Sequence, residues 1–192
     1  LLTVRGVLDM PYPPYAILRL INACNDMEDP RSFRKAPSMK STKLLNAYDA
    51  HTSLRYLEYK GLAFVSGRDF CNIHHWRLAD REQPTGAIHS VAYEEERLDL
   101  CPLVTGLVRG KLVIAGYVLE PVGEQEVRTR VTYVVKTDIG GSIPGWVIKM
   151  KAKEQPMQLL TLQTMLNEEA ESYPGGRTKY VHDMLRVPEK CM

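Results

Sequence analysis

The chain has 192 residues, a formal net charge of +2, 44% hydrophobic residues and 25% charged residues. This length is enough for one domain with a large core, and so small a net charge gives no reason to expect nucleic acid as a partner. The four cysteines stand far apart without a Cys-x-x-Cys pair, which argues against a zinc site or a disulfide framework. No apolar run approaches the roughly 20 residues that cross a bilayer. We therefore expect a reduced, cytoplasmic protein.

The first part of the chain reads as a strand followed by a helix. Residues 1–8 alternate between apolar and polar side chains, and the three prolines that follow force a turn. Over residues 15–24, apolar side chains recur at the spacing of a buried helical stripe: Ile17, Leu20, Ile21 and Cys24. Because the chain starts without Met and inside a strand, we expect it to be a segment of a longer protein.

A basic stretch follows over residues 31–43, with five basic side chains and no acidic one. The simpler interpretation is a solvated loop. The alternative is a patch for anionic lipid headgroups, near which each charge contributes about 1 kcal/mol. Both interpretations stay open for the five residues concerned: Arg31, Arg34, Lys35, Lys40 and Lys43.

A series of strands then occurs at the spacing of β-hairpins. Turn-forming residues such as Asp49-Ala50 and Ser66-Gly67 separate alternating or β-branched runs. This pattern predicts an antiparallel meander, in which each strand pairs with the next. We expect the strands over residues 43–48, 52–59, 69–78, 87–93, 107–114, 116–120 and 127–136.

The connection over residues 94–104 is too long for a hairpin turn and carries leucines behind three glutamates. One interpretation is a loop that folds back on the core through these leucines. The other is a lid, because loops of this length are often functional and exposed leucines at a tip can touch a membrane. We predict membrane contact for Leu98, Leu100 and Leu103.

A long helix is expected to begin near Ile143, where the apolar period changes from two to about 3.6. Gly140 and Gly141 allow the chain to reverse with positive φ, and Ser142 is a candidate N-cap. The expected apolar face contains Val147, Met150, Met157 and Leu160 and ends at Met165 and Leu166.

No set of residues suits a catalytic mechanism or a metal site. The sequence lacks a Gly-x-Ser-x-Gly motif, a phosphate-binding glycine loop and a dinucleotide fingerprint. His74 and His75 are neighbours on a predicted strand, so they point to opposite faces and cannot share an ion. One face of that strand mixes aromatic with hydrogen-bonding groups, which suits the lining of a cavity: Phe70, Asn72, His74 and Trp76. We therefore predict a ligand-binding protein that is not an enzyme and has no cofactor.

Short motifs occur in a fixed order and together span roughly residues 3–166. They are residues 4–11, Ser66-Gly67-Arg68-Asp69-Phe70 with Trp76-Arg77, Ser90-Val91, Val108-Arg109-Gly110, and residues 129–132 and 138–144. In this order they make the chain resemble a StAR-related lipid-transfer (START) domain. The resemblance implies an α+β helix-grip fold, in which a curved antiparallel sheet wraps around a long C-terminal helix and encloses a hydrophobic tunnel for one lipid. The leading helix and first strands usual in the family are expected to be missing from this segment.

The resemblance also implies a class of ligand. Sterol-carrying members show an arginine where this chain has His74, whereas residues 140–146 look more like the phosphatidylcholine and ceramide carriers of the family. By that analogy we expect a glycerophospholipid or ceramide-like lipid, with Arg55, His74 and Tyr133 as candidates for the headgroup. The alternatives are a sterol-binding domain, a lipid-sensing module of a larger protein, or a helix-grip hydrolase or cyclase. The predicted lipid-binding residues are Arg55, Phe70, Asn72, His74, Trp76, Tyr133, Val147, Met150 and Met157.

We assign residues 1–170 to this domain and residues 171–192 to a C-terminal tail that leaves it. The expected partners are the lipid ligand and, transiently, a membrane surface, so the protein would be a monomer peripheral to membranes. The final helix and the 94–104 loop would form a lid over the tunnel. It would open at a bilayer, because interactions with the membrane replace the intramolecular interactions that opening breaks.

Overall fold

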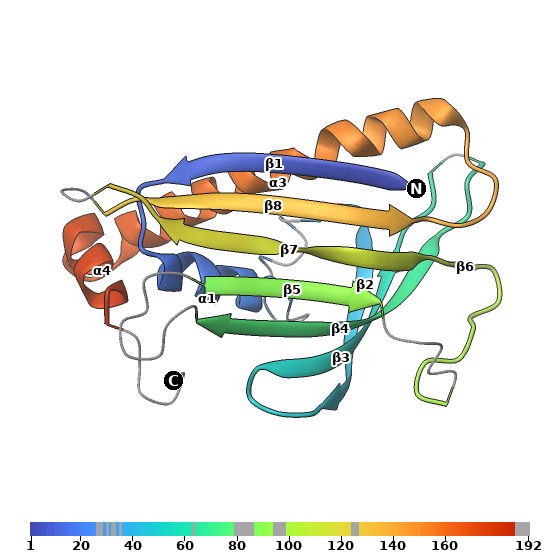
Figure 1. Cartoon of the computed structure of the whole chain (residues 1–192), viewed down its shortest axis with the longest axis horizontal. Helices are drawn as coiled ribbons and strands as arrows, with labels where there is room; N and C mark the ends of the chain where they lie inside the picture. Colours follow the sequence, from blue (N-terminus) through green and yellow to red (C-terminus); the bar gives the residue numbers. More distant parts are fainter. Residues whose placement is uncertain are drawn as a thin grey trace.

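The computed structural model describes residues 1–25, 29, 31, 34, 36–62, 64–78, 87–93, 99–123 and 127–186, and for residues 87–93 the description concerns the backbone alone. Its helices and strands follow one another from the first residues to the last described ones (Figure 1). In chain order they are β1 (Leu2–Met10), α1 (Pro14–Ala23), β2 (Met39–Ala47), β3 (Thr52–Tyr59), β4 (Arg68–Leu78), β5 (Ala87–Tyr93), β6 (Val108–Arg109), β7 (Lys111–Pro121), β8 (Thr129–Asp138), α3 (Gly145–Ser172) and α4 (Gly176–Met184).

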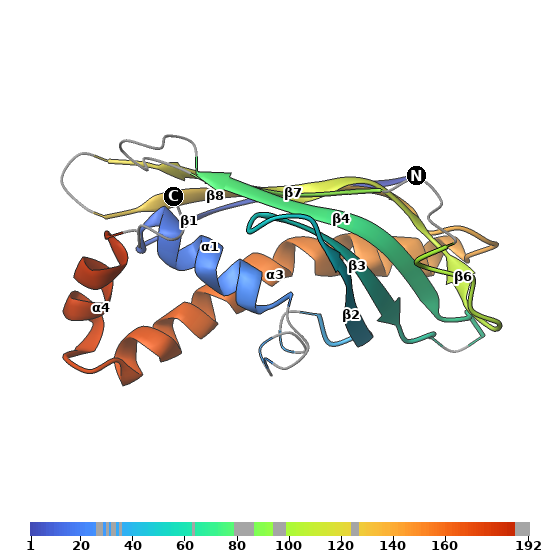
Figure 2. The same ribbon diagram turned by 90° about the horizontal axis from the view of Figure 1, so that it is seen from below.

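The strands form one curved sheet in the order β1-β8-β7-β5-β4-β3-β2, and all neighbours in this order pair antiparallel. Strand β1 lies at one edge beside β8, where Leu2 is opposite Thr137. The short β6 lies off this path and runs parallel to the start of β4. Figure 2 shows α1 and α3 on the same side of the sheet. The predicted meander and the α+β helix-grip class are confirmed.

The predicted break within residues 107–120 lies in a different place. The break lies at Gly110, between β6 and β7, where a Cβ would overlap the ring of Phe70. Beyond it, β7 runs without interruption through Ala115 and Gly116. The extra residue between Leu112 and Ile114 is absorbed by a shift of register against β8, which is the usual effect of a β-bulge.

Helix α3 begins two residues later than predicted and continues six residues beyond Leu166. Pro144 is its N-cap residue, and among the described side chains none makes a capping hydrogen bond there, so Ser142 does not have the expected role. The late start has a steric cause, because the residue before a proline avoids the helical conformation and Ile143 precedes Pro144.

The buried face of α3 also differs from the expected one. Leu159 and Leu162 are buried, whereas Met157 is 56% exposed and Leu160 is exposed as well. Residues two positions apart are separated by about 200° around a helix. The predicted apolar stripe, which contains Met157, therefore lies on the opposite side of the helix from the buried stripe, which contains Leu159.

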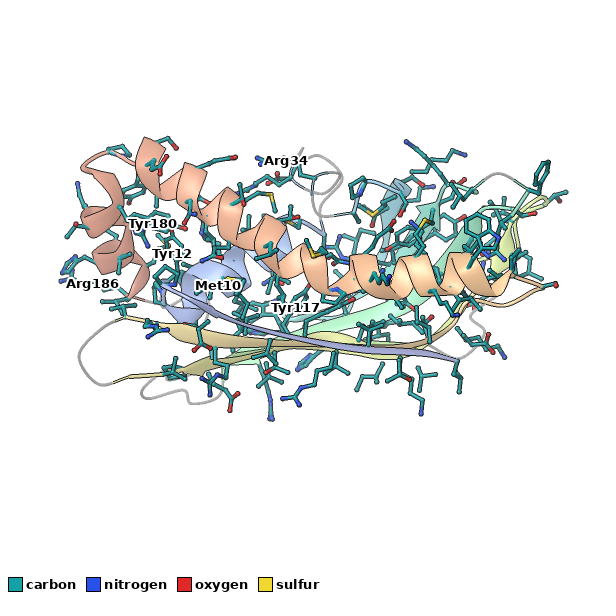
Figure 3. The ribbon with its side chains drawn as sticks, turned by 90° about the horizontal axis from the view of Figure 1, so that it is seen from above. Met10, Tyr12, Arg34, Tyr117, Tyr180 and Arg186 are labelled. Carbon is teal, nitrogen blue, oxygen red and sulfur yellow. The ribbon has the colours of Figure 1, made fainter. Side chains whose placement is uncertain are left out.

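The main core lies between α1, the sheet and the C-terminal half of α3, and α4 closes it at one end of the molecule. We expected a tail that leaves the domain, but Tyr180 of α4 is fully buried and its ring stands edge-on to Tyr12 at 6.0 Å (Figure 3). Gly175 and Gly176 have φ of +96° and +72°, so the Pro-Gly-Gly run makes a tight turn and not a linker. Among the described helices, none has the length and apolar character to span a membrane.

Candidate functional site

A cavity of about 310 Å³ lies between the inner face of the sheet, the N-terminal half of α3 and residues 36–39. Strands β4 and β8 contribute alternate side chains to its wall, because every second residue of a strand points to the same face. Strand β7 contributes Leu112 and, beyond its shift of register, residues 115–117. The volume is at the lower end of the roughly 300–1,000 Å³ that is usual for small-molecule sites.

Neutral hydrogen-bonding groups gather around the middle of the cavity. The Tyr133 hydroxyl donates to Gln155 Oε1 at 2.9 Å, and Gln158 Nε2 donates to the same oxygen at 2.9 Å. The Tyr117 ring lies 4.9 Å from the Tyr133 ring (Figure 3 labels Tyr117 beside α3). Within the described part of the chain, the buried Asn72 Oδ1 accepts no hydrogen bond. This cluster can receive a hydroxyl or an amide of a ligand.

Burial keeps the phenols of this cluster in their neutral form. It raises the pKa of Tyr133 and raises the pKa of Tyr117 well above the ordinary value. Burial also raises the pKa of Tyr59, which lines the same cavity, to about 12. All three groups are therefore hydrogen-bond donors at physiological pH.

Cationic groups lie at one end of the cavity, where β4 begins. The Arg68 guanidinium donates to the carbonyl oxygens of Ile139 and Gly140 at 3.3 Å each, and burial lowers its pKa. Lys60 and Lys151 also line the cavity, and Lys151 pairs with Glu154 at 2.6 Å. The wall thus has a neutral polar middle and a basic end.

A smaller pocket of about 210 Å³ lies beside the cavity, and both share Asn25 and His74 in their walls. Arg55 lines this smaller pocket, where its Nη1 donates to the Asn25 carbonyl oxygen at 2.6 Å. Its Nε donates to Ser53 Oγ at 3.2 Å. The His51 and Trp76 rings lie 4.1 Å apart in the same wall. The smaller pocket is therefore the more polar of the two.

The structure distributes the predicted lipid-binding residues over three places. The cavity is lined by Phe70, Asn72, His74, Tyr133 and Val147. The smaller pocket is lined by Arg55, Trp76 and, again, His74. Met150 and Met157 belong to neither lining.

Sequence reasoning missed the polar groups that α3 and β7 contribute. Gln155 and Gln158 are three residues apart, so they lie on one side of the helix and both reach the Tyr133 hydroxyl region. Tyr117 follows the alternation of β7, two residues after the cavity-lining Ala115. The spacing in β7 could have indicated that Tyr117 lines the cavity. Gln155 and Gln158, in contrast, have the sequence pattern of an ordinary helix surface.

The loop before β6 is held to the sheet by a buried ion pair. Arg109 Nη2 lies 2.9 Å from Asp69 Oδ2, and the same group donates to the carbonyl oxygen of Pro102 at 3.1 Å. Leu100 packs against a small cluster with Leu54, Cys71 and Cys101, whereas Leu103 is exposed. Leu98 lies outside the described residues. The packing of Leu100 therefore agrees with a loop that folds back on the core. Membrane contact by Leu103 stays a prediction.

Three of the four described basic residues of the basic stretch have acidic partners within the protein, and Lys35 lies outside the described residues. Arg31 pairs with Asp29 and, at 3.3 Å, with Glu169. Arg34 lies 2.6 Å from Glu168, and Lys40 lies 2.6 Å from Glu58. These contacts connect the stretch to α3 and β3, and they reduce the charge that it offers to an anionic lipid surface.

Comparison with known proteins agrees with this geometry. A search of curated protein sequences gave no match. Among solved structures, human StAR-related lipid transfer protein 5 matches with a TM-score of 0.68 and 17% identity, over 85% of this chain and 74% of that one. Human STARD10 matches with a TM-score of 0.67 and 16% identity, over 97% of this chain and 73% of that one. A STAR-related lipid transfer protein from Xanthomonas axonopodis matches with 0.62 and 24% identity, over 84% of each chain.

These likenesses concern the fold, and the family follows from the sequence itself. The model of the START domain family matches residues 33–168 of the 192. The match covers most of the sheet, most of the cavity wall and most of α3. The chain belongs to the START domain family.

Proposed function

We propose that this START domain binds one lipid in its cavity and carries it between membranes without a covalent step. The observation that supports the proposal is a cavity of about 310 Å³ with a mostly apolar wall and a cluster of neutral hydrogen-bonding groups inside it. An apolar ligand portion gains about 25 cal/mol for each Å² that leaves water. The polar cluster gives such a ligand a defined orientation.

The polar head of the ligand would lie near Tyr133, Gln155 and Asn72 and extend toward the smaller pocket through the shared wall at His74. A glycerophospholipid or a ceramide-like lipid has such a head. Arg55 would meet a phosphate there, but its guanidinium already donates to Asn25 and Ser53. The neutral donors match hydroxyl and amide groups more directly, which favours the ceramide-like lipid.

A sterol is the second candidate, and the cavity volume supports it. A value near 300 Å³ suits a compact ring system better than two long acyl chains. The sterol hydroxyl would then bond to Asn72 or Tyr133. Native mass spectrometry of the purified chain, followed by lipid extraction, distinguishes the candidates by the mass of the bound molecule. A chain that holds no lipid and takes up none from vesicles would contradict the whole proposal.

A pair of substitutions on one helix tests the location of the ligand. Val147→Asp places a charge in the cavity wall, and we expect at least about a tenfold loss of bound lipid, since a buried charge without a partner is strongly unfavourable. Met157→Asp makes the same change at an exposed position outside the cavity and is expected to bind lipid like wild type. Circular dichroism of both variants shows whether each is folded. Equal lipid occupancy in the two folded variants would contradict a ligand along Val147.

A further inference from the structure

Two buried cysteines lie on the outer face of the sheet, away from the cavity. Phe70, Asn72 and His74 of β4 line the cavity, so Cys71, which alternates with them, points to the opposite face. Cys101 belongs to the loop before β6. Both residues are in the thiol form, and they are 3% and 2% exposed. Neither thiol belongs to the cavity wall or to the main core, so the proposed function does not use them.

The loop before β6 brings Cys101 onto the outer face of β4. Leu54, Cys71 and Cys101 form one cluster of buried side chains, and Leu100 packs against it. Tyr56 of β3 is opposite Cys71 in the strand register and packs against the same cluster. Figure 1 shows β6 and the loop before it at the end of the molecule where β4 begins. The two cysteines are 30 positions apart in the sequence, so only the fold brings them together.

The Arg109 side chain holds the loop in this position. Its Nη1 and Nη2 donate to the Cys101 carbonyl oxygen at 3.3 and 3.4 Å, and its Nε and Nη2 donate to the Asp69 carboxylate at 3.0 and 2.9 Å. Asp69 lies two positions before Cys71 on β4, so both side chains point to the outer face. The pKa of Arg109 is raised by its hydrogen bonds to Asp69 and, less strongly, by the charges that both cysteines would carry as thiolates. One guanidinium group thus lies beside both thiols.

The loop that covers the two thiols borders directly on water. Residues 102–106, which follow Cys101, are all exposed. A local opening of this loop requires far less free energy than global unfolding and brings a small oxidant to the cluster. Thiols that are buried in the closed state can therefore react without loss of the fold.

We infer that Cys71 and Cys101 are a redox site, at which hydrogen peroxide converts the two thiols to a disulfide that fastens the loop before β6 to β4. The thiolate of one cysteine attacks a peroxide oxygen and the O–O bond breaks, which leaves a sulfenic acid and a hydroxide that takes up a proton. The other thiol then forms the S–S bond and displaces the sulfenic oxygen as water. The two thiols lose two electrons, and one peroxide is reduced to two water molecules. A dithiol reverses the reaction by thiol–disulfide exchange.

The disulfide has a consequence for stability and for the cavity wall. It closes a segment of 30 sequence positions, which restricts the unfolded chain more than the folded one. We expect oxidation to raise the midpoint of thermal unfolding by roughly 5–10 °C. Because Phe70 and Asn72 on either side of Cys71 line the cavity, the disulfide also connects the cavity wall to the outer loop. This inference goes beyond the proposed function, since it holds with or without a bound lipid.

Peptide mapping of the folded full chain tests the redox site. The chain is treated with hydrogen peroxide, alkylated with N-ethylmaleimide and digested with trypsin without reduction. Trypsin releases residues 69–77 and 98–109 as peptides with one cysteine each. We expect mass spectrometry to find these two peptides linked, with a mass lower by two hydrogens than their sum, and dithiothreitol to separate them. The same treatment in concentrated urea should give a mixture of cysteine pairs, because the unfolded chain lacks the cluster.

Variants of single cysteines complete the test. Cys71→Ser and Cys101→Ser are each expected to abolish the linked peptide and the rise in the midpoint of thermal unfolding. The matched control is Cys24→Ser, which changes a thiol that is equally buried but lies in the main core, and it should keep both. Alkylation of both thiols after peroxide treatment, or their separate oxidation to sulfinic acids, would overturn the inference. A linked peptide without a rise in the midpoint would show that the disulfide does not fasten the loop.

Discussion

At the scale of single residues, the cavity depends on phenols that stay neutral. Tyr117 and Tyr133 are 4% and 6% exposed, and burial raises the pKa of both above the ordinary 10.0. Above that pH the unfolded chain loses protons that the folded protein retains. The contribution of these groups to stability is therefore fully present below pH 10 and falls as the pH rises further.

We expect the free energy of unfolding to decrease above pH 10 by about 1 kcal/mol per pH unit for each of these phenols. Urea titrations at neutral pH and at a pH above 10 measure this decrease in the free energy of unfolding. Tyr133→Phe should show a smaller decrease than wild type, because it removes one ionisable group from the buried pair. Tyr48→Phe, at an exposed position, is the control and should keep the full decrease. Equal decreases in the free energy of unfolding of Tyr133→Phe and Tyr48→Phe above pH 10 would contradict this expectation.

The Asp69–Arg109 pair is a second feature of single residues. Asp69 is 1% exposed, so Arg109→Met leaves a buried carboxylate without its cation, and we expect a loss of about 3–5 kcal/mol in the free energy of unfolding. Arg130→Met breaks a pair of the same length with Asp9 on the surface and should cost less than about 1 kcal/mol. Chemical denaturation of both variants measures the difference. Similar losses would mean that burial of Asp69 contributes little.

At the scale of elements, α3 has two halves with different surroundings. The C-terminal half packs into the core, and Glu169 pairs with Arg19 and Arg31. In the half before Pro156, all of which the structure describes, Val147 alone is buried, because the cavity lies beneath it. The two halves meet where Pro156 lies directly on Gly6 of β1.

The contact of Gly6 with Pro156 leaves no room for a side chain. A Cβ at Gly6 would lie 3.0 Å from Pro156 Cβ and 3.3 Å from its Cα, so Gly6→Val must displace the helix. We expect a loss of about 1–3 kcal/mol in the free energy of unfolding. Gly145→Ala, at the start of the same helix, meets nothing within 4 Å and should be neutral or slightly stabilising. An unchanged midpoint of thermal unfolding for Gly6→Val would contradict this close contact.

At the scale of the whole molecule, local patterns predicted the order and type of the elements. Residues 52–59 and 87–93 are strands with the predicted bounds, because alternation and turn residues are local signals. The position of α4 could not be predicted, because burial of Tyr180 depends on Tyr12, which is distant in the sequence. Gln155 and Gln158 were missed for the same reason, since their role depends on Tyr133 across the cavity.

The core and the candidate site share residues on β7 and β8. The core residues around Tyr12 and Leu166 do not line the cavity, and Val147 lines the cavity without belonging to this core. Both sets contain Ala115, Tyr117, Tyr133 and Val135. Substitutions near Tyr12 should therefore change stability, substitutions at Val147 should change lipid binding, and substitutions at the shared residues should change both.

The ion pairs of Glu168 and Glu169 have a kinetic consequence for ligand exchange. They join the C-terminal half of α3 to Arg19, Arg31 and Arg34, whereas among the described residues no such pair ties the first three turns of the helix to another element. Local unfolding of those turns would require far less free energy than global unfolding. Backbone amides of residues 147–155 should then exchange with deuterium much faster than those of residues 159–170, and bound lipid should slow the first group alone. A cavity can thus be opened and refilled many times while the rest of the fold never unfolds.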